Sequence, residues 1–169
     1  MELLAHARIV IWEGGALWVV EATAPAAPGR STDLHAHHAI QITVSLGGHF
    51  RLATSDEHMT GDAVAIAADT GHTFQAEGLF AILFAEPESR LGRAIAARLL
   101  SGKNLAAIPR ELLGDYTRQI AGVFGAGGRN ENELIALGRA LSAHLAADMR
   151  GDVPDLRVRK VIAWAHQQL

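Results

Sequence analysis

The 169-residue chain contains no cysteine. Disulfide bonds, thiolate metal ligands, iron–sulfur clusters and a cysteine nucleophile are therefore excluded, and the composition suits a reducing compartment. The chain also lacks an apolar run near the roughly 18 to 20 residues that span a bilayer. Its first residues show no positively charged stretch followed by a long apolar segment and a cleavage site. We therefore expect a cytoplasmic protein with no membrane-spanning segment.

A strong charge of one sign is missing too. Fifteen Lys and Arg stand against 18 Asp and Glu, giving a formal net charge of −3, whereas a protein that mainly grips phosphates usually carries a basic excess. Hydrophobic residues make up 49% and charged residues 20%, which is typical of a globular protein and argues against general disorder. The length fits one domain, or one domain with a helical appendage.

The first half of the chain has the two-residue periodicity of strands. Turn signals at Glu13-Gly14-Gly15, Gly47-Gly48 and Thr70-Gly71 separate short β-rich runs. The predicted strands cover residues 7–12, 16–21, 34–46, 49–53, 63–67, 72–76 and 79–85. Many short strands at close spacing predict a β-sandwich or barrel.

The second half follows the 3.6-residue period of helices. Ser89 can cap a helix that runs to residue 100, and Pro109 suits the first position of a second helix. Asn130, with Glu133 three residues later, forms a cap signature for a third helix. That helix carries an apolar seam of Leu134, Leu137, Leu141 and Leu145. Two interpretations of the seam stay open: it docks on the β-domain, or it pairs with the same helix of a second copy.

A polar row on the longest predicted strand suggests a binding site. His35, His37 and Gln41 have the same parity, so their side chains point to one side, and Thr43 and Ser45 continue that row. The row is expected to line a pocket, while the apolar even-numbered row lies under helices or another sheet. Imidazole nitrogens and an amide oxygen that converge on one point suit a divalent ion such as Zn, Ni, Fe or Mn.

Two spaced patterns carry a family resemblance. The first consists of Gly29, His35, His37, Gln41 and Gly48, and the second of Gly61 and His72. Together they resemble the paired histidine motifs of the cupin superfamily, and most closely the sensor domain of AraC-type transcription factors. The resemblance implies that His72 joins the other two histidines as a metal ligand. It also implies a carboxylate at the position where this chain has Gln41. Because an amide is neutral, Asp33 or Asp69 could supply the negative charge that offsets part of the charge of the ion.

The resemblance also implies a domain organisation. A cupin (jelly-roll) β-sandwich or barrel is expected over residues 1–86, a helical dimerisation region over residues 87–150, and a linker with the first helix of a truncated helix-turn-helix domain over residues 151–169. The partners implied are a small-molecule effector, a second copy of the chain through the C-terminal helices, and DNA only through a domain that this chain lacks. We therefore expect no sequence-selective DNA binding by the chain alone.

The expected function is recognition of a small effector, a divalent metal or both inside the barrel of an AraC-type regulator. In a simpler interpretation, the histidines and Gln41 are only the polar lining of an effector pocket, and His72 is a turn residue. A metal-dependent cupin enzyme (dioxygenase, isomerase or hydrolase) is the main rival, and a storage cupin is a weaker one. Of the other histidines, His38 is expected to serve in packing or at an interface.

Overall fold

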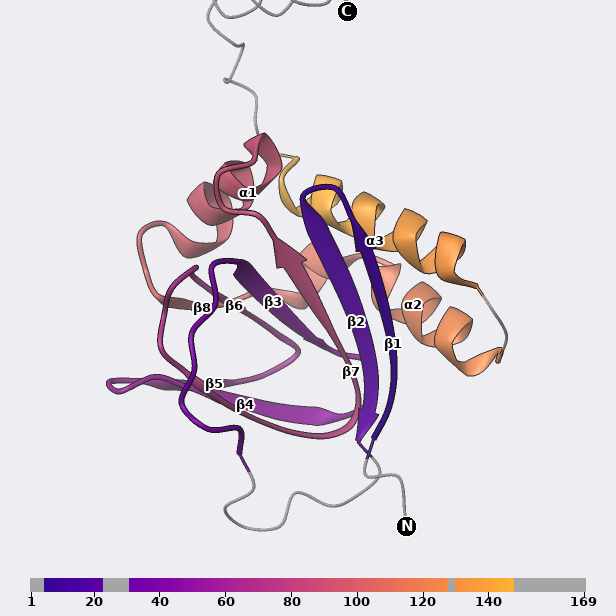
Figure 1. Ribbon diagram of the computed structural model, residues 1–169, viewed down its shortest axis with the longest axis horizontal. Coiled ribbons are helices and arrows are strands. Elements are labelled where there is room, and N and C mark those ends of the chain that lie inside the picture. The colour runs from indigo at the N-terminus through magenta and orange to yellow at the C-terminus, as the bar shows by residue number, and fades with distance from the viewer. Residues whose placement is uncertain (1–4, 23–30, 128–129, 148–169) are drawn as a thin grey trace, which may run out of the picture.

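Two antiparallel sheets that share one long strand form the β-part of the molecule (Figure 1). The computed structural model describes residues 5–22, 31–127 and 130–147. The strands are β1 (Ala5–Trp12), β2 (Gly15–Ala22), β3 (Ile40–Ser45), β4 (His49–Ala53), β5 (His58–Thr60), β6 (Ala63–Ile66), β7 (Thr73–Ala85) and β8 (Leu105–Ala107). The larger sheet has the order β1-β2-β7-β3-β6-β8, and β4 pairs with β5 and β7.

Strand β7 passes from one sheet into the other. Its first five residues pair with β4, and the part from Gly78 onward pairs with β2, then also with β3. Gly78 has a φ of 76°, a left-handed conformation that glycine adopts without strain. Gly48 faces this bend so closely that an added Cβ would clash with the carbonyl oxygen of Glu77. These two glycines allow one strand to serve both sheets.

The two rows of side chains on β3 face different layers, as their alternation predicts. The even row (Ile40, Ile42 and Val44) is buried in the core that the larger sheet forms with the helices. The odd row lies on the face of Val64 and Ile66, which are the cross-strand partners of Thr43 and Gln41. On that face a second apolar cluster, of Phe50, Leu52, Val64, Ile66 and Leu105, fills the space between the sheets.

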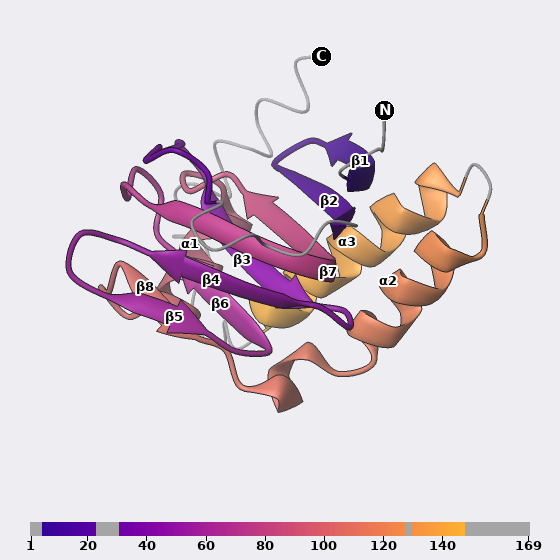
Figure 2. The same ribbon diagram turned by 90° about the horizontal axis from the view of Figure 1, so that it is seen from below.

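Helices cover one face of the larger sheet (Figure 2). They are α1 (Arg90–Ile95) with its π-helical continuation η1 (Ala96–Leu100), the 3₁₀ turn η2 (Arg110–Leu113), α2 (Tyr116–Gly125) and α3 (Glu131–Leu145). The predicted cap at Ser89 is confirmed, because its Oγ accepts the backbone N–H of Gly92 at 2.8 Å. The predicted side-chain cap at Asn130 is wrong: the residue has φ −96° and ψ 38°, not the extended backbone of a capping residue.

Most of the leucine seam of α3 is buried inside the chain. Leu134, Leu141 and Leu145 are at most 2% exposed, and α3 packs on β1, β2, β7 and α2. The fit is close at Gly138, where an added Cβ would lie 2.5 Å from Cη2 of Trp12. Three of the four leucines therefore dock inside the chain, which favours the first interpretation, and Leu137 is only partly buried.

Several element boundaries differ from the sequence-based expectation. The strand predicted over residues 34–46 is regular only from Ile40 to Ser45. The helix predicted from Pro109 is interrupted at Gly114, whose φ of 53° separates η2 from α2. Strands β5 and β8 were not expected, because three residues carry too little alternation to be recognised.

Some expectations concern residues that the structure does not describe. Gly29 of the first motif lies there, and so does the whole of residues 151–169, where the start of a DNA-binding domain is expected. Among the helices in the described ranges, none is long and apolar enough to cross a bilayer.

Candidate functional site

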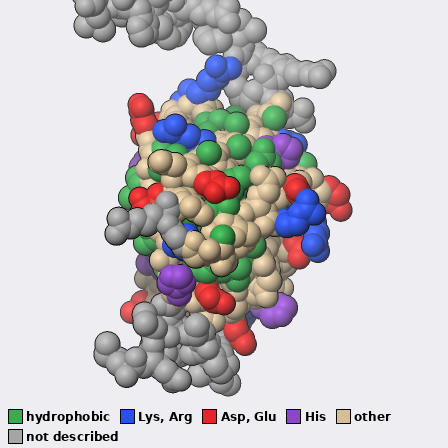
Figure 3. All heavy atoms as spheres, turned by 90° about the vertical axis from the view of Figure 1, so that its right-hand side faces the viewer, with side chains coloured by type: hydrophobic (Ala, Val, Ile, Leu, Met, Phe, Trp, Pro, Cys, Tyr) green, Lys and Arg blue, Asp and Glu red, His purple; other side chains and the backbone are tan. Residues whose placement is uncertain are grey.

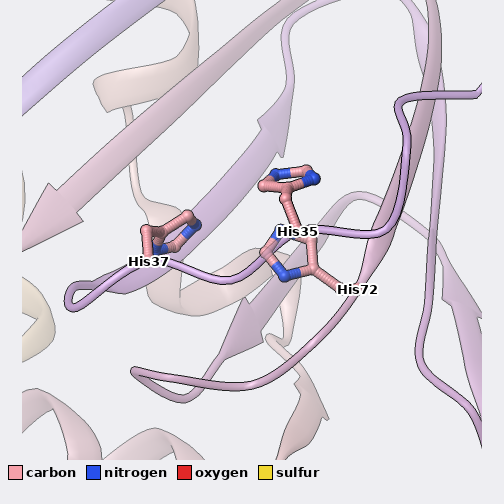
Figure 4. A group of neighbouring side chains, drawn as sticks. All are labelled: His35, His37 and His72. Carbon is pink, nitrogen blue, oxygen red and sulfur yellow. The ribbon is translucent and has the colours of Figure 1, made fainter.

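Backbone pairing between two distant segments brings the histidines together (Figure 4). His35 precedes β3 and His72 directly precedes β7, and the two residues form an isolated antiparallel bridge. The N–H of His35 donates to the carbonyl of His72 at 3.0 Å, and the N–H of His72 donates to the carbonyl of His35 at 2.8 Å. His37, two residues further along the first segment, joins the same cluster.

One ring nitrogen of each of these histidines lies within 4.8 Å of those of the other two. The ring centroids of His35 and His72 are 4.4 Å apart, and those of His37 and His72 are 5.1 Å apart. Nitrogens that share one tetrahedral zinc ion lie about 3.4 Å apart, given a zinc–nitrogen distance of about 2.1 Å. The ring nitrogens would therefore have to approach one another by up to about 1.4 Å to share one ion. We call His35, His37 and His72 the histidine triad.

The three histidines of the triad differ in their exposure to solvent. His72 is 1% exposed, His37 is half-buried and His35 is exposed. The site is therefore anchored inside the molecule at His72 and opens to solvent at His35.

The backbone orients each imidazole in the same way. In all three rings Nδ1 donates to a carbonyl two residues away: His35 to Asp33 at 2.8 Å, His37 to Ala39 at 3.0 Å and His72 to Thr70 at 2.8 Å. A neutral imidazole with its hydrogen on Nδ1 has a free lone pair on Nε2. Metal-binding histidines are held in this manner by a partner on the other ring nitrogen.

The Nε2 atom of His72 is the least satisfied polar atom of the site. It is buried and has no hydrogen-bond partner in the described part of the chain. Burial lowers the pKa of His72, and the neighbouring His35 and His37 lower it further, against the opposing effect of the bond to Thr70. The ring is therefore neutral at pH 7, with a buried lone pair that a metal ion would use.

Gln41 is the fourth predicted ligand, and the structure places it beside the triad. It is 3% exposed, and its Oε1 lies 2.8 Å from Nε2 of His37. If His37 carries its hydrogen on Nδ1 alone, the lone pairs of its Nε2 and of Oε1 of Gln41 face each other here. A divalent cation would accept both, whereas in its absence a reversed amide would donate to His37 and accept from Thr43, whose Oγ1 is 3.0 Å from Nε2 of Gln41.

The two residues predicted to line an effector pocket do not join the triad. Thr43 is fully buried and contacts Gln41. Ser45 lies at the turn between β3 and β4, where its hydroxyl donates to the carbonyl of Gly48 at 2.6 Å. That position is about 13 Å along the strand from Gln41. The odd row therefore continues past the site, fully buried at Thr43 and partly exposed at Ser45.

Two aromatic residues next to the triad were missed by the sequence analysis. The Phe84 ring meets the edge of His37 at a centroid distance of 5.2 Å, and Trp18 packs on Phe84, also at 5.2 Å. Trp18 is 38% exposed, and its cross-strand neighbour Ile9 is 51% exposed. The alternation of side chains along β2 and β7 shows which residues share a face. It places Trp18 and Phe84 next to the triad only when the register between β2, β7 and β3 is known.

Of the two roles expected for His38, packing in an apolar environment is wrong, and a role at an interface stays a prediction. The side chain is exposed, with Nδ1 2.8 Å from Oδ2 of Asp69 and Nε2 2.8 Å from Oε1 of Glu88. The hydrogen bonds to Asp69 and then Glu88 raise the pKa of His38, and the two negative charges add to this.

No carboxylate completes the histidine triad within residues 5–22, 31–127 and 130–147. The Asp69 carboxylate bonds to His38, and Asp33 contributes its backbone carbonyl to His35. Neither carboxylate is among the groups that could coordinate one ion together with the triad.

No family model and no curated protein matches the chain. Solved structures with a similar backbone include an RmlC-like cupin from Shewanella frigidimarina (14% identity, TM-score 0.41, covering 52% of this chain and 78% of that one). KdgF from Halomonas sp. is another (22%, TM-score 0.41, 50% and 82%), as is an HTH_3 family transcriptional regulator from Vibrio cholerae (14%, TM-score 0.40, 51% and 53%). Similarities this low carry no functional argument. The predicted class, mainly β followed by helices, is confirmed by the sheets and helices themselves.

Proposed function

We propose that this chain is the sensor part of an AraC-type transcriptional regulator, built on a cupin domain that binds a divalent metal. His35, His37 and His72 would hold the ion, with Gln41 as a fourth ligand. The observation that carries the proposal is the shared orientation of the triad: three Nδ1 atoms are tied to carbonyls, and one Nε2 is buried without a partner. Such an arrangement stabilises a cation better than it stabilises an empty pocket.

The chemistry of the four ligand side chains indicates which ions the site would bind and what kind of additional ligand the ion would accept. Three imidazoles and an amide suit Zn, Ni, Fe or Mn. All four groups are neutral, so the bound ion would keep its double positive charge and act as a Lewis acid towards a small molecule. We infer that the effector supplies oxygen donors and negative charge, and that it reaches the ion from the exposed side, at His35.

The effector surface next to the triad is aromatic. Phe84 and Trp18 continue from His37 on the same face of the larger sheet, and Trp18 is partly exposed. This surface replaces Thr43 and Ser45 as the proposed contact for the body of the effector. An effector that binds the ion through a carboxylate or a similar group, and that carries an apolar group as well, would bury apolar surface against these two rings.

Transmission to DNA would require the helices to respond to the effector. A ligand shifts the population only by binding one arrangement of sheet and helices better than another. We retain residues 1–86 as the sensor and residues 87–150 as the dimerisation region. Because most of the leucine seam is buried, the dimer contact would use other surface of the molecule. Figure 3 shows one such face, on which hydrophobic side chains lie among charged ones.

Calorimetric titration with zinc tests the metal part of the proposal. Metal-stripped protein is expected to bind one zinc ion per chain, and His35→Ala and His72→Ala are each expected to weaken binding by at least about tenfold. His58→Ala is the matched control, since His58 is exposed on β5, outside the triad. Stoichiometric binding that survives both triad substitutions, or no binding by the unaltered chain, would contradict the proposal.

A metal-dependent cupin enzyme, a dioxygenase or isomerase, is the second candidate. The exposure of His35 favours it, because an ion held at the mouth of the site would have open positions for a substrate. Oxygen uptake by the metal-loaded protein with aromatic carboxylates separates the candidates. Catalytic turnover would favour the enzyme, and binding without turnover would favour the sensor.

A further inference from the structure

An ion-pair network next to the triad connects three segments of the chain. His38 directly follows the triad residue His37, Asp69 lies in the loop that leads to His72, and Glu88 precedes helix α1. Both ring nitrogens of His38 are engaged, each 2.8 Å from a carboxylate oxygen. We call His38, Asp69 and Glu88 the clasp.

The Asp69 end of the clasp holds the loop of His72 against the segment of His37. The backbone N–H of Asp69 donates to the carbonyl of His37 at 2.9 Å, and its carboxylate accepts from the His38 ring. Asp69 has a φ of 60°, an uncommon conformation for a residue other than glycine. Local bonds of this kind are what keep such a conformation in place. The position of His72, three residues later, depends on this loop.

The Glu88 end of the clasp reaches the helices. Ser89, the next residue, caps α1 through the N–H of Gly92, and the carbonyl of Glu88 accepts from the guanidinium of Arg93. Helix α1 packs in turn against α3. A displacement of His38 would therefore act directly on the first turn of α1.

We propose that His38, through Asp69 and Glu88, positions the two metal-binding loops and passes the metal-bound state of the triad to helix α1. His38 is thus a positioning residue and not a ligand. The proposal rests on the proposed function, because it gives a route by which a loaded triad acts on the helical region.

The magnitudes are consistent with this role. A single exposed ion pair contributes little to stability, so the clasp is not needed for folding. His38 bonds to no ring of the triad, so its effect on metal affinity is limited to what such a pair contributes, about two- to fivefold. Closing the triad around an ion would draw the two loops together, and the ring of His38 would transfer that movement to Glu88.

Zinc titration and hydrogen exchange of the full chain test both ends of the clasp. His38→Gln and Asp69→Asn are expected to weaken zinc binding about two- to fivefold. Glu88→Gln is expected to abolish the zinc-dependent slowing of amide exchange in α1 that we expect of the unaltered chain. Because coupling is reciprocal, it should also weaken zinc binding, by at most about fivefold. His58→Gln and Glu57→Gln are matched exposed controls and should change neither property.

Each outcome decides one part of the inference. Unchanged zinc affinity in His38→Gln would overturn the positioning role, and zinc-dependent protection of α1 that persists in Glu88→Gln would overturn the transmission. In metal-free protein, His38→Gln should also speed exchange of the His72 amide about two- to fivefold, the range that a weak ion pair supplies. If the unaltered chain binds no zinc, the proposed function fails, and this last measurement still supports or overturns the clasp.

Discussion

At the scale of single residues, the candidate site is organised by the backbone. Each triad imidazole is oriented by a carbonyl two residues away, so its tautomer is fixed within its own segment. Parity along the strand was enough to predict that His35, His37 and Gln41 point to one side. The sequence could not show the environment of His38, because its partners Asp69 and Glu88 are 31 and 50 residues away.

The protonation of His38 is a prediction at this scale. Its pKa is expected to lie above the ordinary value of 6.5, because the hydrogen bonds to Asp69 and Glu88 stabilise the imidazolium. The folded-state pKa exceeds the unfolded one, so the stabilisation is complete below pH 6.5 and is lost as the pH rises through the folded-state pKa.

NMR titration of the imidazole in metal-free protein measures that pKa directly. The unfolding midpoint of the unaltered chain should also exceed that of His38→Gln by more at about pH 6 than at about pH 9. His58→Gln provides the reference. A pKa at or below the ordinary value, or a midpoint difference that does not depend on pH, would contradict the ion-pair network.

At the scale of elements, the alternation of apolar and polar residues, together with the turn residues, predicted most of the strands. The predicted strand over residues 34–46 fails at its start because His35 pairs with His72 before β3 begins. The helix predicted from Pro109 fails at Gly114, where the backbone turns left-handed. Strand pairing between distant segments and the backbone conformation of one glycine cause these interruptions. Neither changes the spacing of hydrophobic residues, so the sequence pattern does not show them.

The docking of α3 on the sheet gives a prediction at this scale. Gly138→Ala should destabilise the chain by about 1 to 3 kcal/mol, because the new methyl group would overlap the ring of Trp12. Gly122→Ala, in α2, has open space at the same atom and should stabilise by up to about 1 kcal/mol through helix propensity.

Urea unfolding of both variants checks this pair. Similar effects of Gly138→Ala and Gly122→Ala would show that α3 does not press on Trp12 as described, and would weaken the account of how the leucine seam is buried.

At the scale of the whole molecule, β3 separates two layers. Its even row lies under the helices, as the sequence predicted, whereas its odd row, which was expected to line a pocket, faces the second sheet. The aromatic neighbours of the triad could not be predicted, because Trp18 and Phe84 meet only through the register of β2, β7 and β3. The site therefore depends on the assembled sheet as well as on the histidine motif.

The proposed effector surface gives a prediction at this scale. With zinc bound, Trp18→Ala should weaken benzoate binding by about 1 kcal/mol, or about fivefold, because a ring contact is lost. Acetate, which offers the same carboxylate without a ring, serves as the matched probe and should bind equally well to both proteins. Calorimetry with the two anions makes the comparison, and an equal loss for both would contradict a separate aromatic contact.

Anomalous X-ray diffraction at the zinc edge, from crystals of the full chain grown with zinc, tests the central claim most directly. The account predicts one anomalous peak within about 2.2 Å of an imidazole nitrogen from each of His35, His37 and His72. A zinc-saturated crystal with no peak between these three rings, or with its peak at other residues, would contradict it.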